Sequence, residues 1–102
     1  MTDKSTERHL VVEFNCLPEN ADRLRGYLME YIEPARAEEG CLYYDLYSNT
    51  QTLGRFFILD GWRTQAAFEG HIQHPNVKRV RALVAPLLSE PTKISINTRI
   101  TD

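Results

Sequence analysis

Hydrophobic residues follow two different periods along the first half of the chain. Segment 9–16 (HLVVEFNC) is rich in β-branched and aromatic residues, which is typical of a strand. In segment 24–35 the apolar residues recur every three or four positions, as on one face of a helix. Asn20 is suited to cap this helix and Gly40 to end it, and Pro34 predicts a kink or a restart because proline lacks an N–H.

The second half alternates between the same two periods. Segments 41–48 (CLYYDLYS) and 55–62 (RFFILDGW) are predicted as strands that are joined by a polar hairpin loop. Thr64 is suited to cap a short helix, and Pro75 is suited to begin a further helix with its own apolar stripe. Segment 91–100 (PTKISINTRI) then alternates between two sets of residues, which predicts a last strand.

The predicted order of elements is therefore β-α-β-β-α-β. This is the order of the ferredoxin-like α+β fold, in which two helical segments cover one face of an antiparallel four-stranded sheet. We expect a flexible N-terminal tail over residues 1–7 and a single domain over residues 8–102, because 102 residues is near the common size of one domain.

The two middle strands carry large apolar side chains on both faces, whereas a sheet that is wet on one side alternates apolar with polar residues. One predicted face holds Leu42, Tyr44 and Leu46 with Phe56, Ile58, Asp60 and Trp62, and the other holds Cys41, Tyr43, Asp45 and Tyr47 with Arg55, Phe57, Leu59 and Gly61. Since the helices can cover only one face, we expect the other to pack against a second copy, giving a homodimer closed sheet against sheet. The alternative is a monomer whose uncovered face binds a ligand.

Composition and charge narrow the possible classes of protein. A net charge of −2 and a pI of about 5.9 are not features of a protein that binds nucleic acid or an anionic membrane. The polar N-terminus lacks the apolar centre of a signal peptide, and no apolar run approaches the ~20 residues of a membrane helix, so we expect a cytoplasmic protein. Cys16 and Cys41 have no zinc-binding spacing and are predicted to be reduced thiols, with no metal site.

Three segments together carry a resemblance to a known family: EEGCLYYDLY, RFFILDGW and AAFEGHIQHP, within the β-α-β-β-α-β order. With them the chain resembles the antibiotic biosynthesis monooxygenase (ABM) domain family, a quinol monooxygenase-like group with a dimeric α/β-barrel fold. The resemblance covers roughly residues 10–91. The family usually has Glu before x-Trp where this chain has Asp60, whose side chain is one methylene shorter, and this difference could alter a structural hydrogen bond.

The resemblance implies an oxygenase that needs no metal or flavin and that acts on a phenol or quinol with molecular oxygen. Other family members process a small signalling sugar, degrade haem or have no known activity. The haem-degrading branch combines an Asn on the first strand with a Trp and a His; Trp62 and His71 match two of these, but a valine rather than Asn15 matches the Asn. Two alternatives stay open: a cofactor-free isomerase or processing enzyme for a small hydroxy-carbonyl compound, and a dimer that binds a small molecule without turnover.

His71 is the candidate catalytic base, because an unperturbed histidine pKa of about 6.5 allows it to accept a proton near neutral pH. Candidate substrate-binding residues are Trp62 as a flat wall for an aromatic ring, Tyr44 through its hydroxyl, Asn15 for a carbonyl and Arg79 for an anionic oxygen. Each also has a plainer interpretation, as core packing or as part of a solvated face. The catalytic interpretation requires a cavity between sheet and helices with His71 and Trp62 on its wall.

The other histidines have weaker claims to a site. His9 opens the first predicted strand and is expected to be exposed. His74 precedes Pro75 and is expected in a loop near the start of the following helix.

Overall fold

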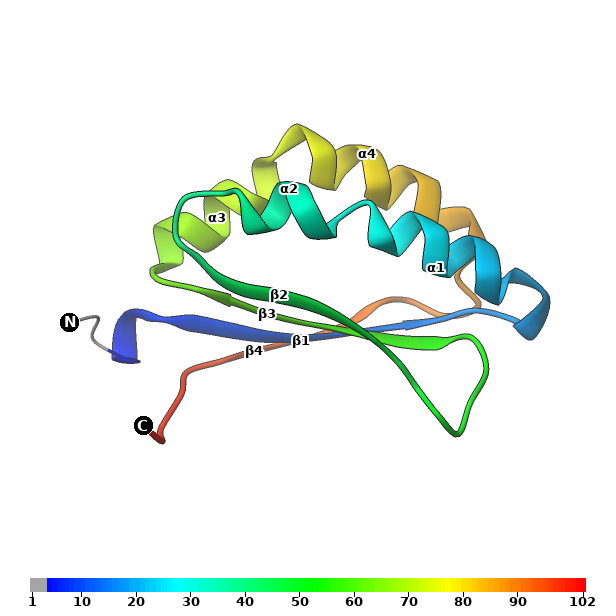
Figure 1. Cartoon of the computed structure of the whole chain (residues 1–102), viewed down its shortest axis with the longest axis horizontal. Helices are drawn as coiled ribbons and strands as arrows, with labels where there is room; N and C mark the ends of the chain where they lie inside the picture. Colours follow the sequence, from blue (N-terminus) through cyan, green and yellow to red (C-terminus); the bar gives the residue numbers. More distant parts are fainter. Residues whose placement is uncertain (1–3) are drawn as a thin grey trace.

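The structure, a computed structural model that describes residues 4–102, contains the predicted order of elements (Figure 1). Its strands are β1 (Arg8–Asn15), β2 (Cys41–Ser48), β3 (Arg55–Trp62) and β4 (Lys93–Asn97). Its helices are α1 (Ala21–Met29), α2 (Ile32–Arg36), α3 (Gln65–Gln73) and α4 (Pro75–Val84), with 3-10 turns η1 (Lys4–Thr6), η2 (Pro18–Asn20) and η3 (Ala85–Leu87). The prediction of a ferredoxin-like α+β fold is confirmed.

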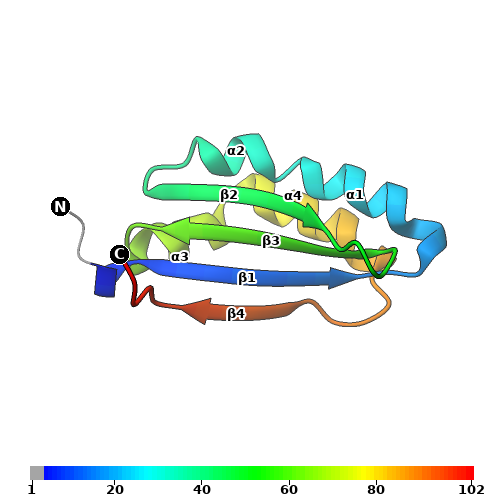
Figure 2. The same ribbon diagram turned by 60° about the horizontal axis from the view of Figure 1, so that its bottom comes forward.

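The four strands form one antiparallel sheet in the order β2-β3-β1-β4 (Figure 2). All four helices lie on one face of this sheet (Figure 1). We call this the covered face and the opposite one the open face. The core lies between the covered face and the helices, and its most deeply buried apolar side chains are Leu24, Leu28, Ile58, Trp62 and Val80.

The first helical segment restarts where the sequence predicts it. Helix α1 ends at Met29 and α2 begins at Ile32, because Pro34 has no N–H to donate to the carbonyl of Glu30. The chain then turns at Gly40, whose φ of 86° is a left-handed conformation that glycine adopts without strain.

The second helical segment begins and divides at its predicted caps. The Thr64 hydroxyl accepts a hydrogen bond from the Ala67 N–H at 3.1 Å, which caps α3. Pro75 is the first residue of α4, and His74 caps that helix by accepting a hydrogen bond from the Asn76 N–H at Nδ1.

The alternation predicted for β2 fails at its first residues. Cys41 pairs with Trp62 and Tyr43 pairs with Gly61, so a β-bulge separates Cys41 from Tyr43. The extra residue shifts the alternation by one position. Cys41 therefore packs against the core, and Leu42 is exposed rather than sharing the covered face with Tyr44.

The N-terminal segment is partly built into the domain. Residues 1–3 of the predicted tail lie outside the described part, but Lys4–Thr6 forms a turn and Glu7 is only 6% exposed. Glu7 is held by a hydrogen bond from His9, so the ordered contacts begin before residue 8. At the other terminus β4 ends at Asn97, earlier than the sequence pattern suggested.

No helix covers the open face (Figure 2), and this face carries apolar side chains. Val11 is 40% exposed and Tyr47 is 50% exposed, and Phe57 and Leu59 between them are partly buried. Apolar groups thus gather on both faces of the central strands, as the sequence predicts.

Candidate active site

A cavity of about 490 Å³ lies between the covered face and the helices, within the size range of small-molecule sites. Its walls are mostly apolar and come from β1, β3, β4, α3 and α4. Its apolar lining includes Leu10, Val12, Phe14, Ile58, Phe68, Val77, Val84, Ile94 and Ile96. Its polar lining consists of Tyr31, Tyr44, Asp60, His71, Arg81 and Thr92.

His71 is positioned by α3 and by a glutamate that lies far from it in the sequence. Its Nδ1 lies 2.8 Å from Oε2 of Glu38, in the turn that follows α2. A carboxylate can only accept, so the neutral imidazole of His71 carries its proton on Nδ1 and its lone pair on Nε2. Among residues 4–102 no group forms a hydrogen bond with Nε2, so that nitrogen is available to a molecule in the cavity.

Aromatic rings fix the plane of the imidazole. The ring of His71 stacks on Trp62 with centroids 4.4 Å apart and an interplanar angle of 28°. Tyr44 packs edge-on against the same imidazole, at a centroid distance of 5.4 Å. The two contacts and the Glu38 hydrogen bond leave little rotational freedom to the side chain.

The surroundings of His71 keep it neutral near pH 7. Burial lowers the pKa of His71, and the hydrogen bond and charge of Glu38 raise it by less. A neutral histidine with a free ring nitrogen can act as a general base.

Asp60 is the second buried ionisable group of the site. Its residue is 2% exposed, and its Oδ2 accepts a 2.8 Å hydrogen bond from the indole N–H of Trp62. The other oxygen, Oδ1, is buried and has no hydrogen-bond partner among the described residues. Burial raises the pKa of Asp60 to about 7, against the opposing effect of the Trp62 hydrogen bond.

Arg81 supplies positive charge to the cavity. It lines the cavity from α4. Its charge opposes the rise that burial causes in the pKa of Tyr31 and adds slightly to the lowering that burial causes in the pKa of His71. In the described part of the chain no carboxylate pairs with it. Burial raises the pKa of Tyr44, whose hydroxyl therefore stays protonated beside the same cavity.

The structure brings together two of the predicted site residues, His71 and Tyr44, on the cavity wall and packs Trp62 against His71. Trp62 is 0% exposed and lies behind the imidazole rather than on the cavity wall. Its ring packs on His71 and its N–H donates to Asp60, and its part as a flat wall for a substrate stays a prediction.

Asn15 and Arg79 lie outside the cavity. Asn15 shares the open face with Glu13, to whose carboxylate it donates, and it accepts a hydrogen bond from Arg55 at the far end of β1. Arg79 lies on the solvent side of α4, where it pairs with Glu30 at 2.9 Å. Both side chains have partners within the protein and are not brought together with His71, and their assignment to substrate binding stays a prediction.

Sequence reasoning missed Glu38, Asp60 and Arg81 as members of the site. Asp60 had a visible signal, since it is an acid between Ile58 and Trp62 on an otherwise apolar face. Arg81 follows Val77 by four positions and precedes Val84 by three, which places it at the border of the apolar stripe. No comparable feature of the sequence indicated that Glu38 would lie beside His71.

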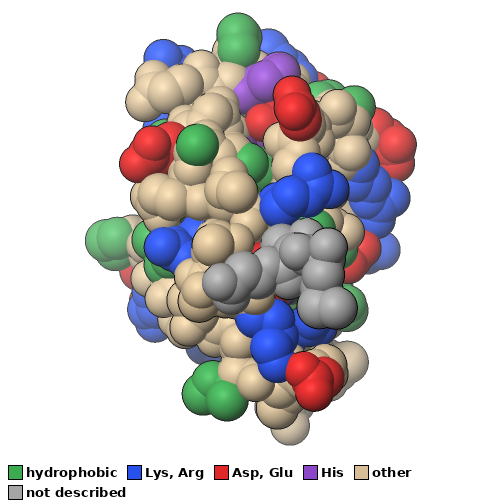
Figure 3. Space-filling model, turned by 90° about the vertical axis from the view of Figure 1, so that its left-hand side faces the viewer, with side chains coloured by type: hydrophobic (Ala, Val, Ile, Leu, Met, Phe, Trp, Pro, Cys, Tyr) green, Lys and Arg blue, Asp and Glu red, His purple; other side chains and the backbone are tan. Residues whose placement is uncertain are grey.

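The molecular surface at the end of the molecule where β1 begins mixes basic and acidic side chains (Figure 3). Within residues 4–102 there is no group of three or more His, Cys, Asp or Glu residues arranged to hold a metal ion. None of the described helices is long and apolar enough to cross a membrane.

Comparison with known proteins supplies the family. The sequence profile described as antibiotic biosynthesis monooxygenase matches residues 8–83, which is most of the chain. The chain belongs to the ABM family. This confirms the resemblance seen in the sequence motifs.

Individual relatives agree with this assignment to the ABM family. The protein named "Putative monooxygenase Rv0793" from Mycobacterium tuberculosis is 31% identical over 87 residues, which cover 85% of each chain. Its solved structure superposes with a TM-score of 0.89 over 95% of this chain and 98% of that one, at 28% identity. The structure of PA3566 from Pseudomonas aeruginosa is similar at a TM-score of 0.88 and 30% identity, and covers 97% of this chain and 99% of that one.

Proposed function

We propose that this ABM-family protein is a cofactor-free monooxygenase that oxidises a phenolic or quinol-type small molecule with dioxygen. The observation that carries the proposal is the free Nε2 of a buried, neutral His71 beside an apolar cavity of about 490 Å³. The apolar walls suit an aromatic ring, and the few polar groups gather where the oxygen atoms of that ring would bind.

The site favours removal of a proton from the substrate. His71 Nε2 accepts the proton of a ring hydroxyl, and the positive charge of Arg81 stabilises the oxyanion that forms. Dioxygen reacts slowly with closed-shell molecules in general. An electron-rich oxyanion can nevertheless react with it by transferring one electron directly. The protein therefore needs to bind the substrate, take the proton and exclude water.

The atoms and electrons of the subsequent steps balance when the substrate is a quinol that carries a hydrogen on the ring carbon next to the hydroxyl-bearing carbon. Superoxide and the semiquinone radical combine at that carbon, and the resulting peroxide anion takes the proton back from His71. His71 then removes the ring proton, the O–O bond breaks, and the departing hydroxide takes that proton to form water. One atom of dioxygen ends as a carbonyl on the ring and the other as water, so dioxygen receives four electrons from the substrate.

The test is the fate of labelled dioxygen during turnover of 1,4-dihydroxynaphthalene. A monooxygenase places one ¹⁸O atom in a hydroxynaphthoquinone product, with a rate that depends on the protein. Simple oxidation to unlabelled naphthoquinone and hydrogen peroxide would contradict the proposal. Turnover of a hydroxy-carbonyl compound without oxygen uptake would instead favour an isomerase, and saturable binding without turnover would favour a binding protein.

We also propose that the open face packs against a second copy of the chain. Val11, Tyr43 and Tyr47 are each more than one-third exposed, and such an apolar surface is usually an interaction site. Sedimentation equilibrium at micromolar concentration should give the mass of a dimer. A monomeric mass would contradict this part of the proposal.

A further inference from the structure

The free oxygen of Asp60 is an unusual feature of the cavity. Oδ1 is buried and unpartnered among the described residues, and Asp60 lines the same cavity as His71. Nearly all buried polar atoms in native proteins have a hydrogen-bond partner. A buried oxygen that lacks a partner inside the protein, in a residue that lines a cavity, is suited to pair with a bound molecule.

Asp60 is held firmly in the orientation that leaves Oδ1 free. On the neighbouring strands it lies opposite Leu10 of β1 and Tyr44 of β2. Trp62 donates to Oδ2, and the indole that makes this bond is itself packed between His71 and the edge of Tyr44. The carboxyl group therefore cannot turn Oδ1 toward a different partner without breaking the indole hydrogen bond.

Other shielded carboxylates among the described residues have partners. Buried Glu7 is bonded to His9, and half-buried Glu38 to His71. Glu13, half-buried on the open face, accepts from Asn15 and lies near Lys93. Asp60 differs from these acids in having a buried oxygen without a partner, in a residue that lines the cavity.

We propose that Asp60 is a second substrate-contacting group, whose Oδ1 binds a substrate oxygen while His71 Nε2 takes the proton of another. The inference rests on the proposed function and narrows its substrate class to rings that carry two oxygen functions, such as dihydroxyarenes or hydroxyketones. The protonated carboxyl group donates a hydrogen bond to the second oxygen and keeps its proton, so the proton transfers assigned to His71 are unchanged.

The charges around Asp60 are compatible with this role. The titratable and charged groups on its side of the sheet are Tyr44 and Cys41 of β2, together with His71 of α3 and Arg81 of α4, which line the same cavity. Only Arg81 among them is a fixed cation, and no ion pair joins it to Asp60. Burial raises the pKa of Asp60 to about 7 and lowers that of His71, so on the acid side of neutrality Asp60 holds a proton while His71 stays neutral.

The experiment compares the binding of 1,4-dihydroxynaphthalene and 1-naphthol, without oxygen, to the full chain and to D60V. Calorimetry should show that the wild-type protein prefers the dihydroxy compound by about tenfold, which is the effect of one buried hydrogen bond. D60V should lose most of this preference, because valine is similar in size to aspartate but has no polar atom to bond the second substrate oxygen. D45V is the matched control, since Asp45 lies on β2, outside the cavity, and pairs with exposed Arg36; it should keep the preference.

A second readout does not depend on the folding of a variant. In wild-type protein with ¹³C-labelled aspartate, the carboxyl signal of Asp60 should shift when 1,4-dihydroxynaphthalene binds, and that of Asp45 should not. Binding and turnover with an unchanged Asp60 signal would overturn this inference and leave the proposed function standing. A shifted Asp60 signal without any ¹⁸O incorporation would support the inference and reject the monooxygenase. Absence of binding would overturn the inference.

Discussion

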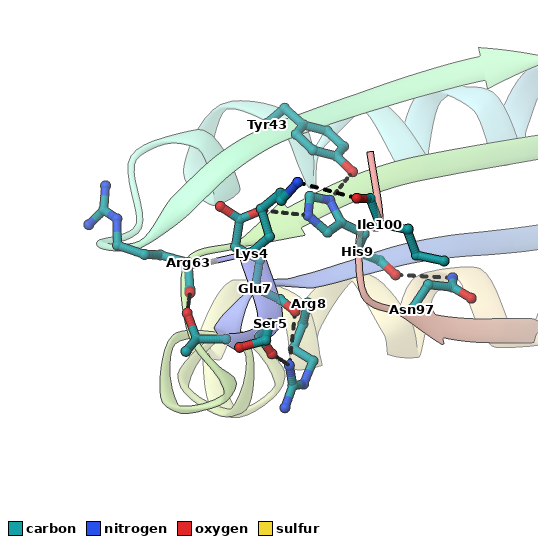
Figure 4. Close-up of polar contacts among 10 residues, drawn as sticks. Lys4, Ser5, Glu7, Arg8, His9, Tyr43, Arg63, Asn97 and Ile100 are labelled. Atoms are coloured by element: carbon teal, nitrogen blue, oxygen red, sulfur yellow. Dashed lines mark hydrogen bonds and ion pairs between the residues drawn. The ribbon is translucent and has the colours of Figure 1, made fainter. Parts of the chain in front are cut away.

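Two histidines on opposite faces of the sheet have similar partners and different surroundings. His71, on the covered side, lies 2.8 Å from Glu38 and packs against the ring of Tyr44. His9, on the open face, lies 2.9 Å from Glu7 and stacks on the ring of Tyr43 (Figure 4). A histidine with a glutamate and a tyrosine is therefore not by itself evidence of a site.

The difference lies in the second ring nitrogen and the space beside it. Nδ1 of His9 is already bonded to the Tyr43 hydroxyl at 2.7 Å, so both of its nitrogens have partners. Tyr43 lies flat over Gly61, where an added Cβ would come within 2.4 Å of the tyrosine ring. His71 keeps Nε2 free and borders a cavity. A general base needs both a free lone pair and room for the molecule that it deprotonates.

The largest expected effect is on catalysis. H71Q should lower the rate of 1,4-dihydroxynaphthalene turnover by ~10²-fold or more, because proton transfer by a positioned base contributes that much. H9Q removes the corresponding histidine of the open face and should change the rate by less than about twofold. Steady-state oxygen uptake, corrected for uncatalysed oxidation, measures both. Equal losses of turnover rate in H71Q and H9Q would contradict the claim that His71, and not His9, acts as the base.

The next effect concerns stability and pH. Asp60 keeps a proton in the folded state up to a pKa of about 7, whereas an unfolded aspartate releases it near pH 4. The folded protein binds the extra proton between these values, so the contribution of Asp60 to stability falls as pH rises, by up to about 1.4 kcal/mol per pH unit.

D60N should abolish this fall in stability with rising pH, and it should become more stable than the wild-type protein toward pH 8. His71 acts in the opposite direction but is present in both proteins, so its effect cancels in the difference. Urea unfolding at several pH values measures the difference, with E7Q as the open-face control. A wild-type-minus-variant difference that is constant with pH would refute the raised pKa of Asp60.

A third comparison removes one hydrogen bond from each face. W62F keeps a ring against His71 but deletes the indole donor to a fully buried carboxyl group, and should cost about 1–3 kcal/mol of unfolding free energy. Y43F deletes the hydroxyl that bonds His9 on the open face and should cost about 0.5–1.5 kcal/mol. W62F should also raise the pKa of Asp60, since that hydrogen bond lowers it. A larger cost for Y43F would be the unexpected result.

The smallest effect distinguishes two arginines of α4. R81Q should weaken the binding of 1-naphthoate, an aromatic anion, by up to about fivefold, because a partly exposed charge pair contributes up to ~1 kcal/mol. R79Q should leave that affinity unchanged, since Arg79 pairs with Glu30 away from the cavity. Fluorescence titration at low ionic strength measures both. A loss confined to R79Q would favour the assignment made from the sequence.

Local patterns predicted the fold and singled out His71 as a candidate base, but they did not predict the groups that surround it. Strand β3 alternates as expected and α1 restarts near Pro34, because both effects depend on neighbouring residues. Glu38 reaches His71 across 33 positions, and the Asp60–Trp62 hydrogen bond depends on burial that only the assembled core creates. Arg79 and Arg81 are two positions apart on α4, which places them about 200° apart around the helix; the sequence singled out Arg79, whereas Arg81 is the one that lines the cavity.

The most direct test of the account is a single ¹⁵N spectrum of histidine side chains, recorded with and without 1,4-dihydroxynaphthalene in the absence of oxygen. The account predicts that the Nε2 signal of His71 moves on binding and that both nitrogen signals of His9 stay in place. Movement of the His9 signals with an unchanged His71 would place the ligand on the open face and contradict the account.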